Sequence, residues 1–154
     1  MIFFYEELIT LEIEKSAQCK FDNYIKNNKF KFESGGILIG TLNHAMNKTI
    51  ITDITEPQHE DRQSRFMFIR REKGHQDIMD MLWKNSHYTK TYLGEWHTHN
   101  EPSPTPSFVD KRNWIKISER DKNSQWLFFI IVGTREIRVW TVIQGKIVAL
   151  NKKS

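Results

Sequence analysis

The stretch GEWHTHNEPSPTPSFVD, Gly94 to Asp110, contains side chains that could bind a metal ion. Residues i and i+2 of a β-strand point to the same side, so His97 and His99 would present both imidazoles to one face at the end of a strand. Asp110 follows a segment with three prolines and could bring a carboxylate to the same point. Two imidazoles and a carboxylate leave a tetrahedral zinc ion with one open position for water, whose pKa zinc lowers to about 7.

Each part of this pattern also has an ordinary structural explanation. Two histidines on one strand face are commonly surface or core residues. Ser107 and Asp110 have the spacing of a helix capping box with Asp in place of Glu, and Trp96 is typical of a core. The combination in one short segment favours a metal site over three separate explanations.

The surrounding elements must bring these residues together. Alternation and β-branched content predict strands, with Phe3 to Tyr5 extending the first strand or pairing beside it. The predicted strands are Leu8 to Ile13, Gly36 to Leu42, Thr49 to Thr55, Arg65 to Ile69, Thr91 to Thr98, Trp126 to Val132, Glu136 to Ile143 and Lys146 to Leu150. Glu56 to Ser64 is polar and predicts a loop.

Three segments show helical spacing. The first helix is capped by Ser16, ends at Asn27 and buries Ala17, Phe21, Tyr24 and Ile25. The second covers Gln76 to Ser86 and presents Ile78, Met81, Leu82 and Asn85 on one face. The third begins at Ser107 and continues to about Arg120. We therefore predict an α/β (α+β) fold, with a single curved, mostly antiparallel mixed sheet flanked by helices.

Length and composition indicate a single domain, residues 1–154. The chain of 154 residues is 38% hydrophobic and 27% charged, with a formal charge of +4. No apolar run reaches the ~18 residues of a membrane span. The basic residues are scattered, which argues against nucleic acid as a partner. The lone Cys19 cannot form an internal disulfide, and no secretory signal is recognisable, so we expect a cytoplasmic protein.

The motif resembles that of a known enzyme family. His97-x-His99, seven residues, Ser107, two residues and Asp110 match the HxHx7SxxD signature of the JAMM, or MPN-plus, metallopeptidases. The upstream stretch ESGGILIG, which begins at Glu33, stands where this family has its glutamate and strand. The short sequence GEWHTH is most similar to the corresponding segment of small bacterial JAMM deconjugating peptidases of mobile-element and anti-phage CBASS operons. Asn100 departs from the proline of many relatives, which could loosen the loop.

This resemblance implies a cytidine-deaminase-like MPN fold and a zinc-dependent isopeptidase with one Zn2+ per chain. It implies His97, His99 and Asp110 as zinc ligands, Glu33 as the general base and Ser107 as the donor to the oxyanion. The expected substrate is a ubiquitin-like or similarly conjugated protein, with the nucleotidyltransferase of a CBASS operon as a further expected partner.

Several alternatives stay open at this point. Glu95 lies on the strand face of the histidines and competes with Glu33 as the base if the resemblance is set aside. A non-catalytic MPN scaffold and a DNA-associated protein with the same signature are rival functions. Cys19 is interpreted as a packing residue, and the remaining histidines are interpreted as surface residues. These are His44, His59, His75 and His87.

Overall fold

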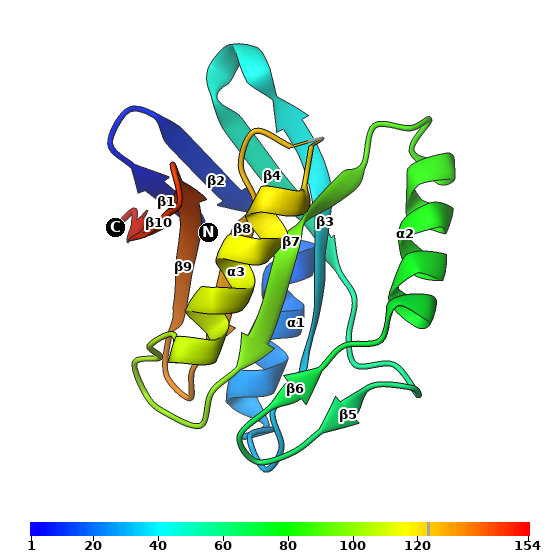
Figure 1. Ribbon diagram of the computed structural model, residues 1–154, viewed down its shortest axis with the longest axis vertical. Helices are drawn as coiled ribbons and strands as arrows, with labels where there is room; N and C mark the ends of the chain where they lie inside the picture. The colour runs from blue at the N-terminus through cyan, green and yellow to red at the C-terminus, as the bar shows by residue number, and fades with distance from the viewer. Residues whose placement is uncertain (123) are drawn as a thin grey trace.

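The computed structural model describes residues 1–122 and 124–154, and in these ranges three α-helices surround a nine-stranded sheet (Figure 1). The strands of the sheet are β1 (Ile2–Tyr5), β2 (Ile9–Ile13), β3 (Gly35–Asn43), β4 (Lys48–Ile54), β7 (Thr91–Thr98), β8 (Phe128–Val132), β9 (Ile137–Ile143), β10 (Lys146–Ala149) and β11 (Asn151–Lys152). The helices are α1 (Lys15–Lys26), α2 (Glu72–Asn85) and α3 (Phe108–Arg120), with a 3-10 turn at His44–Met46. A small ribbon is formed by β5 (Arg62–Gln63) and β6 (Phe68–Ile69).

The strand order is β10-β9-β8-β7-β3-β4-β2-β1-β11. Neighbouring strands are antiparallel except for two parallel pairs, β2 with β4 and β7 with β8. The predicted fold class, a mostly antiparallel mixed sheet with flanking helices, is therefore confirmed. Within the described ranges no helix has both the length and the apolar character needed to cross a membrane.

Different helices cover the two faces of the sheet. Phe128 of β8 packs in the same cluster as Phe21 of α1, whereas the next residue, Phe129, packs with Trp114 of α3. Successive strand residues point to opposite faces, so α1 and α3 lie on opposite sides, with α3 in front in Figure 1. Tyr92 packs against both the α3 cluster and the α2 cluster, which places α2 on the α3 side.

A β-bulge at Gly94 decides which face the end of β7 presents. The pairing of β7 with β3 shifts register here, and Gly94 has a φ of +125°. A Cβ at this position would lie 1.9 Å from the backbone oxygen of Phe128, so the position requires glycine. Leu93 and Trp96 both pack on the α1 side although they are three residues apart, because the bulge reverses the alternation. It thereby turns His97 toward α3, where its ring lies 6.4 Å from that of Trp114.

The prediction for α2 was wrong in its start and partly wrong in its buried face, since Ile78 and Leu82 pack against the sheet as predicted but Met81 and Asn85 are exposed. The helix begins at Glu72, and its buried residues are His75 and Met79, while Met81 is 52% exposed. His75 was expected on the surface but is fully buried, because Thr55 and Asp61 supply partners for both ring nitrogens. These contacts fix the rotation of the helix on the sheet.

The first helix and the ribbon also differ in part from the predictions. The N-cap of α1 is Glu14, because the Ser16 hydroxyl donates to the backbone oxygen of Thr52 instead. Cys19 is exposed on α1, so its interpretation as a packing residue was wrong. The strand predicted over Arg65 to Ile69 is only two residues long, and the terminal strand β11 was missed.

Candidate active site

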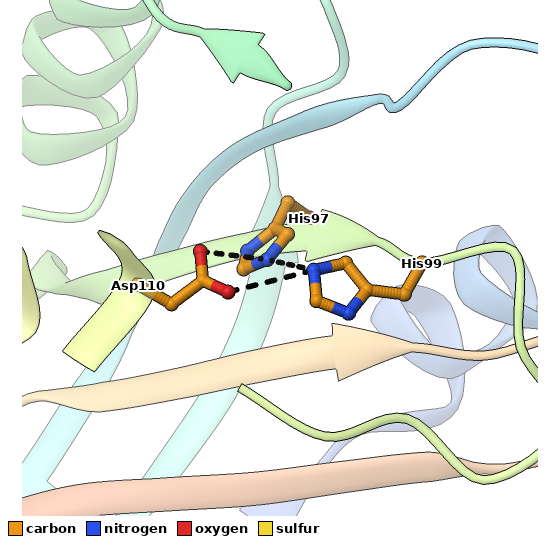
Figure 2. A group of neighbouring side chains, drawn as sticks. All are labelled: His97, His99 and Asp110. Carbon is orange, nitrogen blue, oxygen red and sulfur yellow. Dashed lines mark hydrogen bonds and ion pairs between the residues drawn. The ribbon is translucent and has the colours of Figure 1, made fainter. Parts of the chain in front are cut away.

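The structure brings the predicted metal ligands together (Figure 2). His97 lies near the end of β7, His99 follows the strand, and Asp110 lies in the first turn of α3. The Nε2 atoms of His97 and His99 are 3.0 Å apart. His97 Nε2 lies 3.2 Å from Asp110 Oδ1, and His99 Nε2 lies 3.5 Å from Asp110 Oδ2. Three donor atoms thus face one point.

The donor set fits a zinc ion. One donor atom from each of His97, His99 and Asp110 lies within 4.8 Å of the other two. Two imidazole nitrogens and a carboxylate oxygen are donor types that zinc prefers. The side chains are 13%, 14% and 18% exposed, so the cluster is largely shielded but open on one side. These three residues would hold the ion.

The cluster perturbs the ionisation of its members. Burial lowers the pKa of His99, but hydrogen bonds to Asp110 and Glu101 outweigh it and raise this pKa to about 9. Burial raises the pKa of Asp110, but the two histidines overcome this effect and hold it well below its usual range. The carboxylate therefore stays ionised, as a metal ligand must be.

Glu101 orients His99 and was not among the site residues predicted from the sequence. Its Oε1 atom lies 3.0 Å from His99 Nδ1 and accepts a hydrogen bond from the Thr105 N–H at 2.8 Å. The Thr105 contact is the main cause that lowers the pKa of Glu101. Because Glu101 accepts a hydrogen bond from Nδ1–H, Nε2 is the ring nitrogen that would bind a metal ion once it has released its proton. The available signal was an acidic residue two positions after a candidate histidine ligand.

Glu33 lies beside the cluster. Its Oε1 atom is 4.0 Å from His99 Nε2, and its side chain is 14% exposed. Burial raises the pKa of Glu33, although the neighbouring histidines oppose this effect. The competing Glu95 is engaged elsewhere, because its Oε1 atom accepts hydrogen bonds from Arg70 at 2.7 and 3.2 Å. The geometry favours Glu33 as the proton acceptor.

Ser107 caps α3 and fixes Asp110. Its Oγ atom accepts from the Asp110 N–H at 3.1 Å, and Asp110 Oδ2 accepts from the Ser107 N–H at 2.7 Å. The capping box predicted as the ordinary explanation is therefore present. The Ser107 hydroxyl accepts in this bond but can also donate its own proton, and a side-chain hydrogen bond from Ser107 contributes to the low pKa of Asp110.

Two cavities adjoin the cluster. One of about 580 Å³ extends from the ligands along α3, and another of about 530 Å³ lies toward Lys31 and Arg65. Both are lined by Glu33, Phe66 and His99. Phe66 is 88% exposed and forms part of the wall of each cavity. The two cavities therefore meet at Glu33, the candidate base, and at His99, one of the candidate metal ligands.

Comparison with known proteins agrees with this geometry. The family model of prokaryotic homologs of the JAB domain matches residues 24–143, a range that includes the whole cluster. The chain belongs to the prokaryotic JAB family. This membership confirms the resemblance to JAMM proteins that the motif indicated.

Curated relatives of this JAB-family chain include two bacterial proteins named CD-NTase/cGAS isopeptidase. The Pseudomonas aeruginosa protein is 30% identical over 129 residues, which cover 84% of this chain and 80% of the relative. The Escherichia coli protein is 33% identical over 134 residues, which cover 87% of this chain and 83% of the relative. The solution structure of a Desulfitobacterium hafniense protein has a similar fold, with a TM-score of 0.64 at 16% identity. The match covers 90% of this chain and 88% of the Desulfitobacterium chain.

Proposed function

We propose that this JAB-family protein is a zinc-dependent isopeptidase that releases a conjugated protein from its target. The observation that carries the proposal is the convergence of His97, His99 and Asp110, with the carboxylate of Glu33 4.0 Å from one of them. A scaffold protein has no need of converging metal donors. The isopeptidase names of the relatives support the same activity.

A zinc ion held by His97, His99 and Asp110 would polarise the substrate carbonyl and lower the pKa of water to about 7. Glu33 takes the proton from the attacking water and passes it to the leaving amine. Its partial burial raises its pKa, which suits a group that must both accept and return a proton. Ser107 donates its hydroxyl proton to the oxygen that becomes negative in the transition state.

The cavities support a substrate that extends past the site on both sides. Each cavity is lined by Glu33 and His99, so one segment can occupy the α3 side while the other lies toward Lys31 and Arg65. The bond between the two segments would then lie beside the base. We propose that the substrate is a ubiquitin-like or similarly conjugated protein. The relatives are named CD-NTase/cGAS isopeptidase, which supports a CD-NTase as one member of the conjugate. We propose that this partner is the nucleotidyltransferase of a CBASS operon.

The experiment compares metal content and conjugate cleavage in matched variants. Wild-type protein is expected to bind one zinc ion per chain and to cleave an isopeptide-linked conjugate. Glu33→Gln should keep the metal and lose about 100-fold or more in rate, because general-base catalysis contributes that much. His97→Ala should lose both metal and cleavage. His59→Ala, which changes an exposed histidine outside the cluster, is the control.

Two results would reject this function. Cleavage retained in His97→Ala would show that the reaction does not use the cluster. Tight, stoichiometric zinc binding without cleavage of any CD-NTase conjugate or linear fusion would leave a metal-binding protein with a different role.

A further inference from the structure

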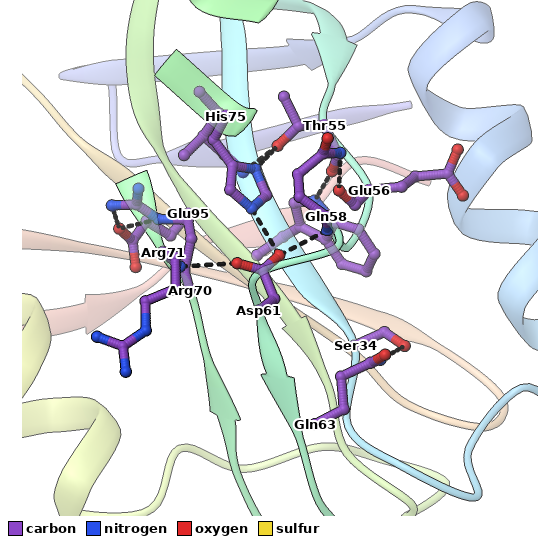
Figure 3. A network of polar contacts seen from close by, with 12 residues as sticks. Ser34, Thr55, Glu56, Gln58, Asp61, Gln63, Arg70, Arg71, His75 and Glu95 are labelled. Carbon is purple, nitrogen blue, oxygen red and sulfur yellow. Dashed lines mark hydrogen bonds and ion pairs between the residues drawn. The ribbon is translucent and has the colours of Figure 1, made fainter. Parts of the chain in front are cut away.

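The backbone of Glu33 is held by the β5–β6 ribbon. The Glu33 N–H donates to the backbone oxygen of Ser64 at 2.7 Å. The side-chain amide of Gln63 donates to the backbone oxygen of Glu33 at 3.1 Å. The same amide donates to Ser34 Oγ at 2.9 Å (Figure 3). Both backbone polar groups of Glu33 are therefore bonded to two adjacent ribbon residues.

The opposite side of this segment is tied to the strand that carries the histidines. The Ser34 N–H donates to Thr98 Oγ1 at 2.9 Å, and the Thr98 N–H donates to the Ser34 oxygen at 2.8 Å. Thr98 lies between His97 and His99 in the chain. Glu33 is thus fixed between β7 on one side and the ribbon on the other.

The ribbon segment is anchored by the buried side chain of Asp61. Its carboxylate accepts hydrogen bonds from the Gln58 N–H and the Arg71 N–H, both at 2.7 Å (Figure 3). Its third partner is His75 Nε2 of α2, at 2.8 Å, and both side chains are fully buried. The two ends of the segment that contains β5 and β6 are therefore held by one carboxylate.

The hydrogen bonds determine the state of His75. Thr55 Oγ1 accepts from the Ile37 N–H at 2.9 Å and lies 2.6 Å from His75 Nδ1. The ionised carboxylate of Asp61 can only accept, so in a neutral His75 the proton is on Nε2 and the Thr55 hydroxyl donates to Nδ1. His75 Nδ1 is then an acceptor, and its Nε2–H donates to Asp61. A continuous series of hydrogen bonds therefore runs from β3 through Thr55 and His75 of α2 to Asp61, which anchors the ribbon.

From these contacts we infer that Gln63 is a positioning residue for Glu33, and that the Asp61–His75 pair keeps Gln63 in place. Calling Glu33 the base rests on the function proposed above. Gln63 lines neither of the two cavities beside His97, His99 and Asp110, so it acts on the reaction through the Glu33 backbone and not by touching the substrate. We infer that the ribbon has two roles: it forms part of the wall of the cavity, and it holds Glu33, the proposed proton acceptor, in place.

The test uses Gln63→Met, which keeps the length of an exposed side chain and removes both donors. The control is Gln76→Met, which removes an exposed amide that donates to Asp80 at 2.8 Å on α2. A displacement of about 1 Å in a reacting group can cost up to about 100-fold, so we expect kcat of Gln63→Met to fall about tenfold. The KM should stay within about twofold of wild type, because binding contacts are unchanged.

A second readout does not depend on activity. Hydrogen exchange followed by mass spectrometry should show faster exchange in peptides covering residues 30–36 of Gln63→Met, with exchange in β8 and β9 unchanged. Zinc stoichiometry should equal that of wild type, since Gln63 contacts none of the three ligands. Gln76→Met should behave as wild type in every measurement.

The outcomes separate this inference from the proposed function. Unchanged exchange at residues 30–36 together with unchanged kcat would overturn the role of Gln63. A rise in KM at constant kcat would also overturn it, because it would indicate substrate contact. If wild type cleaves no conjugate while exchange still rises in Gln63→Met, the isopeptidase proposal fails and the structural support of Glu33 by Gln63 stands.

Discussion

The Nδ1 atom of His99 and the Oε1 atom of Glu101 are 3.0 Å apart, and this contact leaves the other ring nitrogen facing His97 and Asp110. Loss of such a carboxylate partner typically lowers metal affinity about 10- to 100-fold. We therefore expect Glu101→Ala to bind zinc about 10- to 100-fold more weakly in competition with a chromophoric chelator. Glu101→Gln, which keeps an acceptor oxygen, should lose less. Equal affinity in Glu101→Ala and wild type would contradict the role assigned to Glu101.

Zinc should stabilise the folded protein. A ligand that binds only the native state at about 100 times its Kd adds about 2.7 kcal/mol. For a chain of this length, that corresponds to a rise in Tm of about 5–10 °C. Removing zinc with a chelator should reverse the shift in wild type, and His97→Ala should show little shift on adding zinc. Calorimetry of both proteins with and without zinc checks this expectation, and an equal shift in the two would argue against the cluster as the binding site.

The Asp61 anchor should make part of the stability depend on pH. Burial raises the pKa of Asp61, but hydrogen bonds from Arg71, Gln58 and His75 outweigh it and lower this pKa below its ordinary value of 3.8. The contribution of the carboxylate is thus fully present above the ordinary pKa and is lost as the pH falls through the lower folded-state pKa. Urea unfolding should show Asp61→Ala less stable than wild type by about 3 kcal/mol at neutral pH.

The difference between Asp61→Ala and wild type should narrow as the pH falls below 3.8. Asp77→Ala, at an exposed position of α2, provides the control for general acid effects. A stability difference that stays constant down to the acid-unfolding limit would show that the ionised form of Asp61 is not what stabilises the fold.

The bulge at Gly94 should tolerate no side chain. Gly94→Ala combines a φ of +125° with a Cβ 1.9 Å from a backbone oxygen, so we expect a loss of about 3 kcal/mol or more in the free energy of unfolding. Gly145→Ala is a matched control, since Gly145 also has a positive φ of 75° but open space around its Cβ. It should cost about 1 kcal/mol. Similar losses in the two variants would mean that backbone strain alone, and not the bulge, explains the requirement.

The sequence predicted the elements that depend on local pattern. The strand Thr91 to Thr98 and the capping of α3 by Ser107 have the predicted bounds, because alternation and capping are properties of neighbouring residues. The convergence of His97, His99 and Asp110 followed from motif spacing. The structure shows that the bulge at Gly94 is what gives the two histidines the required face. The isolated glycine within the strand pattern was the available signal for this bulge.

Features that depend on distant partners were not predictable in the same way. His75 is polar and lies in a polar stretch, and its burial follows from Thr55 and Asp61, which approach it only in the folded chain. The support of Glu33 by Gln63 is of the same kind, because 30 positions separate the two residues. The Glu101 contact is close in sequence, but its meaning depends on the ring orientation of His99.

The single cysteine of the chain offers a practical route to binding measurements. Cys19 is exposed on α1, and α1 covers the face of the sheet opposite to α3. A maleimide fluorophore attached there would give one label per molecule, behind the sheet from the metal ligands. Changes in the anisotropy of this label would report the capture of a large conjugate, and the label would leave the cavities beside His99 and Glu33 unobstructed.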